Sequence, residues 1–194
     1  MYSEAIAIYA GDGLVTSAFE LINKDMMLFF DNPDKLKMRI NASYELAKGS
    51  GVRGMVAGQI ADIEAEDRSC SKELIDFIHT NKTAAMIIAA IRAGAFLGGA
   101  RGQILDDLTL YGEYLGLLFQ MTDDILDITG TFNELGKEVN ADSKNNKSTY
   151  ISMYDVDEAK KKAEDLAAKA KESIQRINDD ADFFIQLIDD VLTR

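Results

Sequence analysis

Apolar residues recur along the chain with the three-to-four-residue spacing of helices, and no stretch alternates long enough to predict a strand. An apolar segment covers residues 2–30, and its Gly11-Asp12-Gly13 interruption suggests a close approach between helices. Asp31-Asn32-Pro33 is a helix-start signal, and the helix it opens should end near Lys48, where Gly49-Ser50-Gly51 breaks the pattern. These patterns predict an all-α protein.

Further helices are predicted along the rest of the chain. The polar Asn81-Lys82-Thr83 indicates a loop that opens a long apolar helix, and Asp155-x-x-Glu158 is typical of a capping box. The stretch 130–148 is rich in Gly, Asn, Asp and Lys, which predicts a loop. The remaining predicted helices cover residues 54–67, 84–100, 106–128, 158–178 and 183–192, with a short helix capped by Ser71.

Composition narrows the class of protein. A chain of 194 residues with 47% hydrophobic and 28% charged residues should form a single helical domain over residues 1–194. Its net charge of −12 argues against a nucleic-acid partner. The run 84–100 is interrupted by Arg92 and rich in Ala and Gly, which favours a buried helix over a membrane span. One cysteine and an amino terminus without a basic region lead us to expect a cytoplasmic protein.

One acidic pair stands out among the four Asp-Asp pairs of the sequence. Asp123-Asp124 is followed three residues later by Asp127 and lies in an apolar segment, whereas the pairs at 106–107, 179–180 and 189–190 look like solvated helix ends. Gln120 and the three aspartates share one helix face, where like charges repel. A cation would relieve that repulsion, and Mg²⁺ is the leading candidate because it prefers carboxylate oxygens and phosphates. The alternative is a solvated acidic face.

Other polar residues could complete a phosphate site. Lys82-Thr83, placed at a helix N-terminus, would offer amide N–H groups and a charge, although a surface lysine beside a capping threonine is the alternative. Lys137 and Lys147 can fold back over the acidic helix, or can simply be solvated. Gln59 and Asp62 form a second polar patch, or a helix surface facing water. His79 is the only histidine, which argues against di-iron, histidine-based zinc and Ser-His-Asp sites.

Taken in order, these motifs resemble the trans-isoprenyl diphosphate synthases, of the farnesyl and geranylgeranyl diphosphate synthase type. The resemblance covers about residues 1–175, and its motifs are specific as an ordered set. They are Gly58-Gln59-x-x-Asp62, Asn81-Lys82-Thr83, Phe119-Gln120-x-x-Asp123-Asp124-x-x-Asp127, Leu135-Gly136-Lys137, Asp142 and Lys147-Ser148-Thr149-Tyr150.

The resemblance implies a helical bundle around a central cavity and a homodimer. It implies prenyl transfer, in which an allylic diphosphate ionises and isopentenyl diphosphate attacks the cation and loses a proton. It also implies a role for each matching residue. Mg²⁺ bridged to the allylic diphosphate would be bound by Asp123, Asp124 and Asp127, and phosphate oxygens would be contacted by Lys82, Lys137 and Lys147. The cation would be stabilised by Thr83 and Gln120, and the isopentenyl pocket would be lined by Phe119. The diphosphate–metal side would be supported by Gln59 and Asp62.

The chain also departs from the family pattern. Family members carry a first Asp-rich motif upstream of the segment with which this sequence begins, and Asn81 and Ala84 replace the His and Gly of a common His-Lys-Thr-Gly. We therefore expect the carboxy-terminal portion of a synthase, with impaired activity by itself. The alternatives are a non-catalytic partner subunit of a larger synthase and an unrelated bundle with an accidental acidic face.

Overall fold

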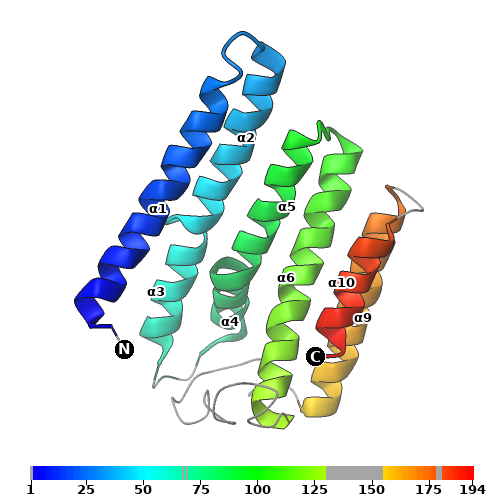
Figure 1. Cartoon of the computed structure of the whole chain (residues 1–194). Helices are drawn as coiled ribbons and strands as arrows, with labels where there is room; N and C mark the ends of the chain where they lie inside the picture. The colour runs from blue at the N-terminus through cyan, green and yellow to red at the C-terminus, as the bar shows by residue number, and fades with distance from the viewer. Residues whose placement is uncertain (1, 67, 69, 130–154, 178–180) are drawn as a thin grey trace.

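A computed structural model describes residues 2–66, 68, 70–129, 155–177 and 181–194. Every regular element in this part of the chain is helical, which confirms the all-α prediction (Figure 1). The elements are α1 (Glu4–Met27), α2 (Pro33–Ser50), α3 (Met55–Ala65), α4 (Lys72–His79), the π-helical turn η1 (Thr80–Ala84), α5 (Ala85–Leu97), α6 (Gln103–Thr129), α9 (Val156–Gln175) and α10 (Asp182–Leu192).

Three helices begin at the capping residues that the sequence indicates. The Asn32 side chain accepts a hydrogen bond from the Lys35 backbone N–H at 3.1 Å, with Pro33 as the first helical residue. The Ser71 hydroxyl accepts one from the Leu74 N–H at 3.3 Å, and the Asp155 carboxylate accepts one from the Glu158 N–H at 2.8 Å. Each cap satisfies an N–H that the first turn leaves without a helical partner. These predicted starts of α2, α4 and α9 are confirmed.

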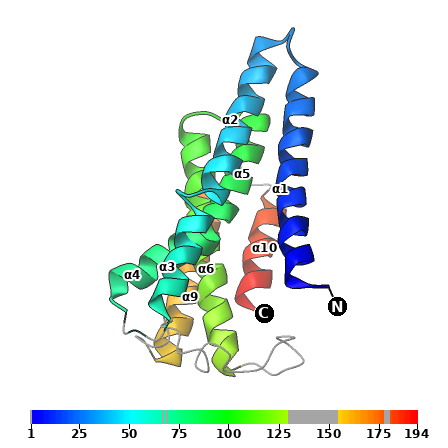
Figure 2. The ribbon, with the colours of Figure 1, turned by 90° about the vertical axis from the view of Figure 1, so that its left-hand side faces the viewer.

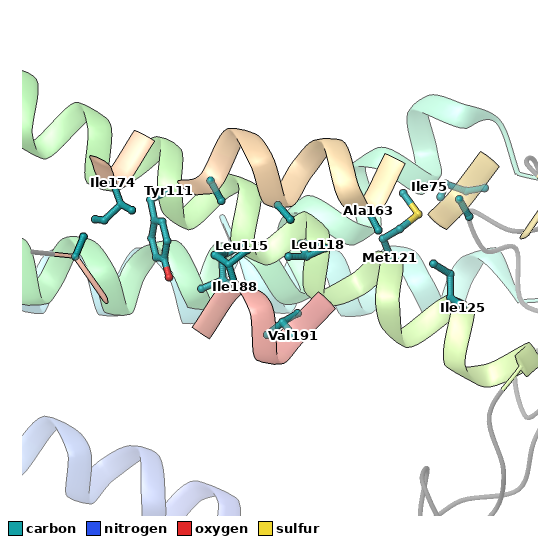
Figure 3. Close-up of a cluster of buried hydrophobic side chains, with 14 residues drawn as sticks. Ile75, Tyr111, Leu115, Leu118, Met121, Ile125, Ala163, Ile174, Ile188 and Val191 are labelled. Atoms are coloured by element: carbon teal, nitrogen blue, oxygen red, sulfur yellow. The ribbon is translucent and has the colours of Figure 1, made fainter. Parts of the chain in front are cut away.

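The helices lie side by side, from α1 at one edge of the bundle to α9 and α10 at the other (Figure 1). The main apolar core lies between α6, α9 and α10, where Tyr111, Leu118 and Ile188 are fully buried (Figure 3). The Tyr111 hydroxyl donates a hydrogen bond to the Phe184 backbone oxygen at 2.9 Å, so its polar atom is satisfied inside the core. The face of α9 toward α6 is alanine-rich, which lets the two helices pack closely: Ala159, Ala163, Ala167 and Ala170 are all buried.

Small residues also bring α2 and α5 together. A Cβ on Gly49 would lie 2.5 Å from the Ala89 Cβ and 2.8 Å from the Ala85 carbonyl oxygen. Gly49 is therefore a packing residue inside α2, which continues to Ser50, and the predicted end near Lys48 is wrong by two residues. The apolar helix expected to be buried is only partly so: α5 packs closely against α2, and its buried residues are Ala89, Ala93 and Ala95.

An ion-pair network joins α2, α5 and α6. The Arg92 guanidinium donates to the Glu45 carboxylate at 2.9 Å and to the Thr109 hydroxyl at 2.6 Å. Glu45 is buried, so its charge requires this partner. The charge that interrupts the apolar run of α5 thus fixes the positions of three helices.

Helix α1 stands at the margin of the fold. It packs chiefly against α2, with an ion pair between Arg39 and Asp25 at 2.7 Å, and none of its residues is buried (Figure 2). A Cβ on Gly11 or Gly13 would meet no atom within 4 Å, so the close helix approach predicted there is absent within the described residues. Most apolar side chains of α1 are exposed, whereas Ile22 and Met26 are half-buried.

Two helical stretches are long and apolar enough to cross a membrane, judged by length and composition alone. They are Glu4–Met27 and the continuous Lys72–Leu97. The first stretch is unburied and the second is 28% buried, and core helices of water-soluble proteins also meet this criterion. The absence of a membrane span therefore stays a prediction.

Candidate functional site

Lys82 and Thr83 lie inside a continuous helix rather than at its beginning. Helix α4 passes through the π-helical turn η1 directly into α5. The backbone N–H groups around Lys82 therefore do not form a free helix N-terminus, and that part of the sequence interpretation is wrong. A π turn has a wider hydrogen-bonding pattern than an α-helix and is frequent at functional sites. Here it changes the direction in which the side chains of η1 point.

Two glycines let the neighbouring helices contact this turn. A Cβ on Gly58 of α3 would lie 2.6 Å from the Lys82 Cα, and a Cβ on Gly116 of α6 would lie 2.5 Å from the Ala84 Cβ. Both distances are shorter than real Cβ contacts allow, so only glycine permits this spacing. As a result η1 is held between α3 and α6, and its polar side chains face residues of both helices.

On the α3 side, Lys82 forms an ion pair with Asp62. The Lys82 Nζ lies 2.6 Å from the Asp62 Oδ2, in a partly buried position. The structure thus brings together a lysine and an aspartate 20 residues apart in sequence, both of which the motif order singles out. Asp62 therefore faces Lys82 and does not lie on a helix surface that faces water.

On the α6 side, a hydrogen-bonded chain links three predicted residues. The Thr83 hydroxyl donates to the Gln120 Oε1 at 3.0 Å, and the Gln120 Nε2 donates to the Asp124 Oδ1 at 3.0 Å. These two bonds fix the orientation of the Gln120 amide, with its oxygen toward Thr83 and its nitrogen toward the carboxylate. Residues that sequence reasoning placed in one site are therefore in direct contact.

His79 also reaches this carboxylate. Its Nε2 lies 3.9 Å from the Asp124 Oδ2, and both side chains are almost completely buried. Burial lowers the pKa of His79 from 6.5 to about 4, although the nearby carboxylates of Asp76 and Asp62 act in the opposite direction. Sequence reasoning used His79 only to exclude other chemistries. His79 lies one helical turn before Thr83, and in a continuous helix this spacing would have placed both side chains on the same face. The loop predicted at Asn81 hid this relation.

The acidic face predicted on α6 is only partly exposed. Asp124 and Asp127 are buried and Asp123 is half-buried, so the face is not a solvated helix surface. Among the described residues, no group of three or more His, Cys, Asp or Glu side chains is arranged to hold a metal ion. The Asp127 carboxylate lies one helical turn from Asp123 and Asp124, so these side chains are neighbours on one face of α6. They do fit Mg²⁺, which commonly takes one or two carboxylates and completes its shell with water and phosphate oxygens.

The remaining predicted site residues are placed as follows. Phe119 packs against the α6–α9 core, and the Arg194 guanidinium lies 4.6 Å from the centre of its ring. Gln59 is half-buried on α3, on the helix that carries Asp62. Lys137 and Lys147 lie outside the described residues, as does the predicted loop 130–148.

Two of the other acidic pairs are not simply solvated. Asp107 is buried and accepts a hydrogen bond from the Arg176 Nε at 3.1 Å, while its neighbour Asp106 is exposed. Asp189 forms an ion pair with Lys171. Lys171 lies on α9 and Arg176 directly follows its last residue, and the sequence separations of 69 and 18 residues explain why local patterns did not reveal these pairs. These pairs hold α9 against α6 and α10.

An apolar hollow of about 480 Å³ lies between α5, α6 and residues at the end of α9 and the start of α10. Ile91 and Leu108 line it, with Phe184 of α10 opposite. Along α5 it begins at Ala90, about 10 Å from Thr83, because each helical residue advances the chain by about 1.5 Å. It is a separate feature from the acidic face.

Comparisons with known proteins identify the family. A family model described as polyprenyl synthetase matches residues 1–191. The farnesyl diphosphate synthase of Geobacillus stearothermophilus is 41% identical over 162 residues, which are 84% of this chain and 53% of that enzyme. The Escherichia coli farnesyl diphosphate synthase is 40% identical over 177 residues, or 91% of this chain and 58% of the enzyme.

Solved structures agree with this match. A Helicobacter pylori geranyltransferase complexed with magnesium and isoprenyl diphosphate has a TM-score of 0.80 at 25% identity, over 99% of this chain and 61% of that one. An apo FPP/GFPP synthase from Zymomonas mobilis has a TM-score of 0.81 at 25% identity, over 98% of this chain and 62% of that one. The chain thus spans less than two thirds of the length of these relatives. With a family model matched over nearly all of its sequence, the chain belongs to the polyprenyl synthetase family.

Proposed function

We propose that this chain carries part of the active site of a prenyltransferase that joins an allylic diphosphate to isopentenyl diphosphate with the help of Mg²⁺. The observation that carries this proposal is the hydrogen-bonded chain from Thr83 through Gln120 to Asp124, beside the Lys82–Asp62 pair. Farnesyl diphosphate synthases related over most of the chain support the reaction class. We also propose that the chain is the carboxy-terminal portion of such a synthase and works in the cytoplasm.

Each residue would contribute a distinct effect to the reaction. The allylic C–O bond breaks and its electron pair leaves with diphosphate; the isopentenyl double bond then forms the new C–C bond, and a proton is lost. Lys82 would bind a phosphate oxygen and would give up part of its interaction with Asp62 when it does so. The oxygens of Thr83 and Gln120 would stabilise the allylic cation electrostatically. Asp123, Asp124 and Asp127 would hold Mg²⁺, which neutralises charge on the departing diphosphate when bound.

Lys82→Ala tests the phosphate-binding part of this proposal. We expect wild-type chain to bind inorganic pyrophosphate in the presence of Mg²⁺, and the substitution to weaken that binding about 10- to 100-fold, the range for losing a hydrogen bond to a charged group. Isothermal titration calorimetry at constant ionic strength measures the effect.

Lys169→Ala is the matched control, because Lys169 is exposed on α9, away from the acidic face. It should leave the affinity within twofold of wild type. Equal losses in both variants would indicate a general charge effect and would contradict a site at Lys82. A wild-type chain without Mg²⁺-dependent binding would refute the proposed function itself.

We further propose that a second copy of this chain packs against α1, forming a homodimer. Single exposed apolar residues are ordinary, but a helix with an apolar surface along its whole length needs a covering partner. Ile8, Tyr9, Leu14 and Val15 are all more than half exposed, and no residue of α1 is buried. A non-catalytic assembly role would use the same surface, but it would not require the acidic face of α6.

Light scattering after size-exclusion chromatography should give twice the mass of the 21.4 kDa chain. Leu14→Lys should shift the protein toward monomer, because it places a charge on the apolar surface of α1. Val52→Lys is the control: Val52 is 78% exposed, similar to the 73% of Leu14, but lies between α2 and α3. A monomeric wild type, or one that partitions into lipid vesicles, would contradict the dimer.

A further inference from the structure

Among the residues that the structure describes, His79 is a buried ionisable side chain beside the acidic face to which the proposed chemistry gives no task. It is the last residue of α4, immediately before η1, and is only 5% exposed. The imidazole ring lies on the α6 side of this helix, as Thr83 does. His79 at the end of α4 and Thr83 in η1, four residues apart, thus present two polar side chains to the same stretch of α6.

The contact between His79 and α6 involves one carboxylate. The His79 Nε2 lies 3.9 Å from Oδ2 of Asp124, while Oδ1 of the same carboxylate accepts the hydrogen bond from Gln120 at 3.0 Å. The two oxygens of Asp124 therefore face two different polar groups on opposite sides. Oδ1 is fixed by a hydrogen bond, whereas the 3.9 Å between Nε2 and Oδ2 is longer than a hydrogen bond, so His79 faces this second oxygen at electrostatic contact distance.

We propose that His79 is a positioning residue that fixes the Asp124 carboxylate through its Nε2–H. Metal-binding and charged side chains in enzymes are commonly oriented by such neighbouring donors, whose loss reduces metal affinity by about 10- to 100-fold. Because Gln120 joins Asp124 to Thr83, the same contact also helps to orient the two residues assigned to the allylic cation. This inference rests on the proposed function for its consequence, but the His79–Asp124 contact can be tested alone.

The sequence offers a favourable probe, since His79 is the only histidine. Its imidazole ¹⁵N signals can therefore be assigned without ambiguity, and they report which ring nitrogen carries a proton. We expect Nε2 to be protonated and its signal to move in Asp124→Asn. The signal should stay in place in Asp106→Asn, a change at an exposed residue near the other end of α6. An unprotonated Nε2, or no response to Asp124→Asn, would overturn the assignment.

Substitutions separate positioning from simple packing. His79→Gln keeps an N–H donor near the place of Nε2, whereas His79→Leu fills the volume without a donor. We expect Mg²⁺-dependent binding of inorganic pyrophosphate to fall about tenfold in His79→Leu and to be largely retained in His79→Gln. A merely structural role predicts that leucine is tolerated at least as well as glutamine, and that outcome would refute the proposal.

Thermal denaturation of both variants identifies any loss caused by misfolding. If His79→Leu does not fold, the ¹⁵N signals of the wild type and of Asp124→Asn still decide whether Nε2–H faces Asp124. If the wild-type chain binds no Mg²⁺–pyrophosphate, the proposed function fails. The NMR comparison then judges the His79 contact independently.

Discussion

Gly58→Ala should lower the free energy of unfolding of this chain by about 3 kcal/mol, the upper part of the usual range for overpacking. The added Cβ would overlap the backbone of Lys82, with its Cα only 2.6 Å away. A flexible side chain can move away from such a clash, but a helix backbone cannot. Helices α3 and η1 must therefore separate, and Gly58 is buried where they meet.

The same substitution should also abolish the Lys82–Asp62 ion pair. Asp62 lies one turn after Gly58 on α3, so any outward shift of α3 carries this carboxylate away from the Lys82 Nζ. We expect Mg²⁺-dependent pyrophosphate binding to weaken at least tenfold in variant protein that is still folded. Urea denaturation and calorimetry on the same preparation measure the two effects.

Gly94→Ala is the matched control for this experiment. Gly94 is also a helical glycine, but a Cβ there would meet no atom within 4 Å. Alanine should therefore stabilise the chain by about 0.5–1 kcal/mol, because it removes the conformational freedom of glycine in a helix. Equal stability changes in the two variants would show that the contact between α3 and η1 is not as close as described.

The glycines also explain which parts of the fold sequence patterns could predict. Asn32, Ser71 and Asp155 act on N–H groups within three residues, so local sequence was sufficient to locate three helix starts. Gly49 was taken as a helix end because glycine disfavours helices, yet its close contact with α5 is a tertiary effect that local propensity does not contain. Local propensity likewise could not predict the π-helical turn at Thr80–Ala84, because the close contacts of this turn with α3 and α6 are tertiary.

The candidate site was predictable to a similar degree. Helical spacing grouped Gln120 with Asp123, Asp124 and Asp127, and the structure confirms that Gln120 contacts Asp124. Spacing within one helix could not show that Thr83, 37 residues earlier, would bind Gln120; the resemblance to a family supplied that expectation. His79 was missed because its polar neighbours Thr80, Asn81 and Lys82 look like a loop. The structure shows that the helix continues through η1 into α5 and that Gly58 and Gly116 let α3 and α6 pack closely against it.

Asp127→Asn should change stability and ligand binding in opposite directions. Three effects disfavour a charge at Asp127 in the metal-free chain. The side chain is 2% exposed, it lies one turn from Asp123 and Asp124, and it falls in the last turn of α6, where the helix dipole repels anions. Removing the charge should raise the free energy of unfolding by about 1 kcal/mol, a change of about 2–4 °C in Tm for a chain of this length.

With Mg²⁺ and pyrophosphate present, the order of stabilities should reverse. Ligand binding stabilises the folded state in proportion to the logarithm of ligand concentration over Kd. Loss of one charged metal ligand from a partly dry site should weaken binding about 100-fold. Wild-type protein should therefore gain Tm on adding both ligands, and Asp127→Asn should gain little.

Asp106→Asn provides the control on the same helix. Asp106 is exposed in the first turn of α6, where the dipole favours an acidic side chain, so its loss should lower Tm slightly and leave ligand binding unchanged. If Asp127→Asn instead destabilises the metal-free chain, Asp127 serves the fold rather than a cation. If it also keeps the ligand-induced rise in Tm, the metal assignment of Asp127 is wrong. The melting curves with and without ligands therefore measure separately what the Asp127 charge does to the fold and what it contributes to ligand binding.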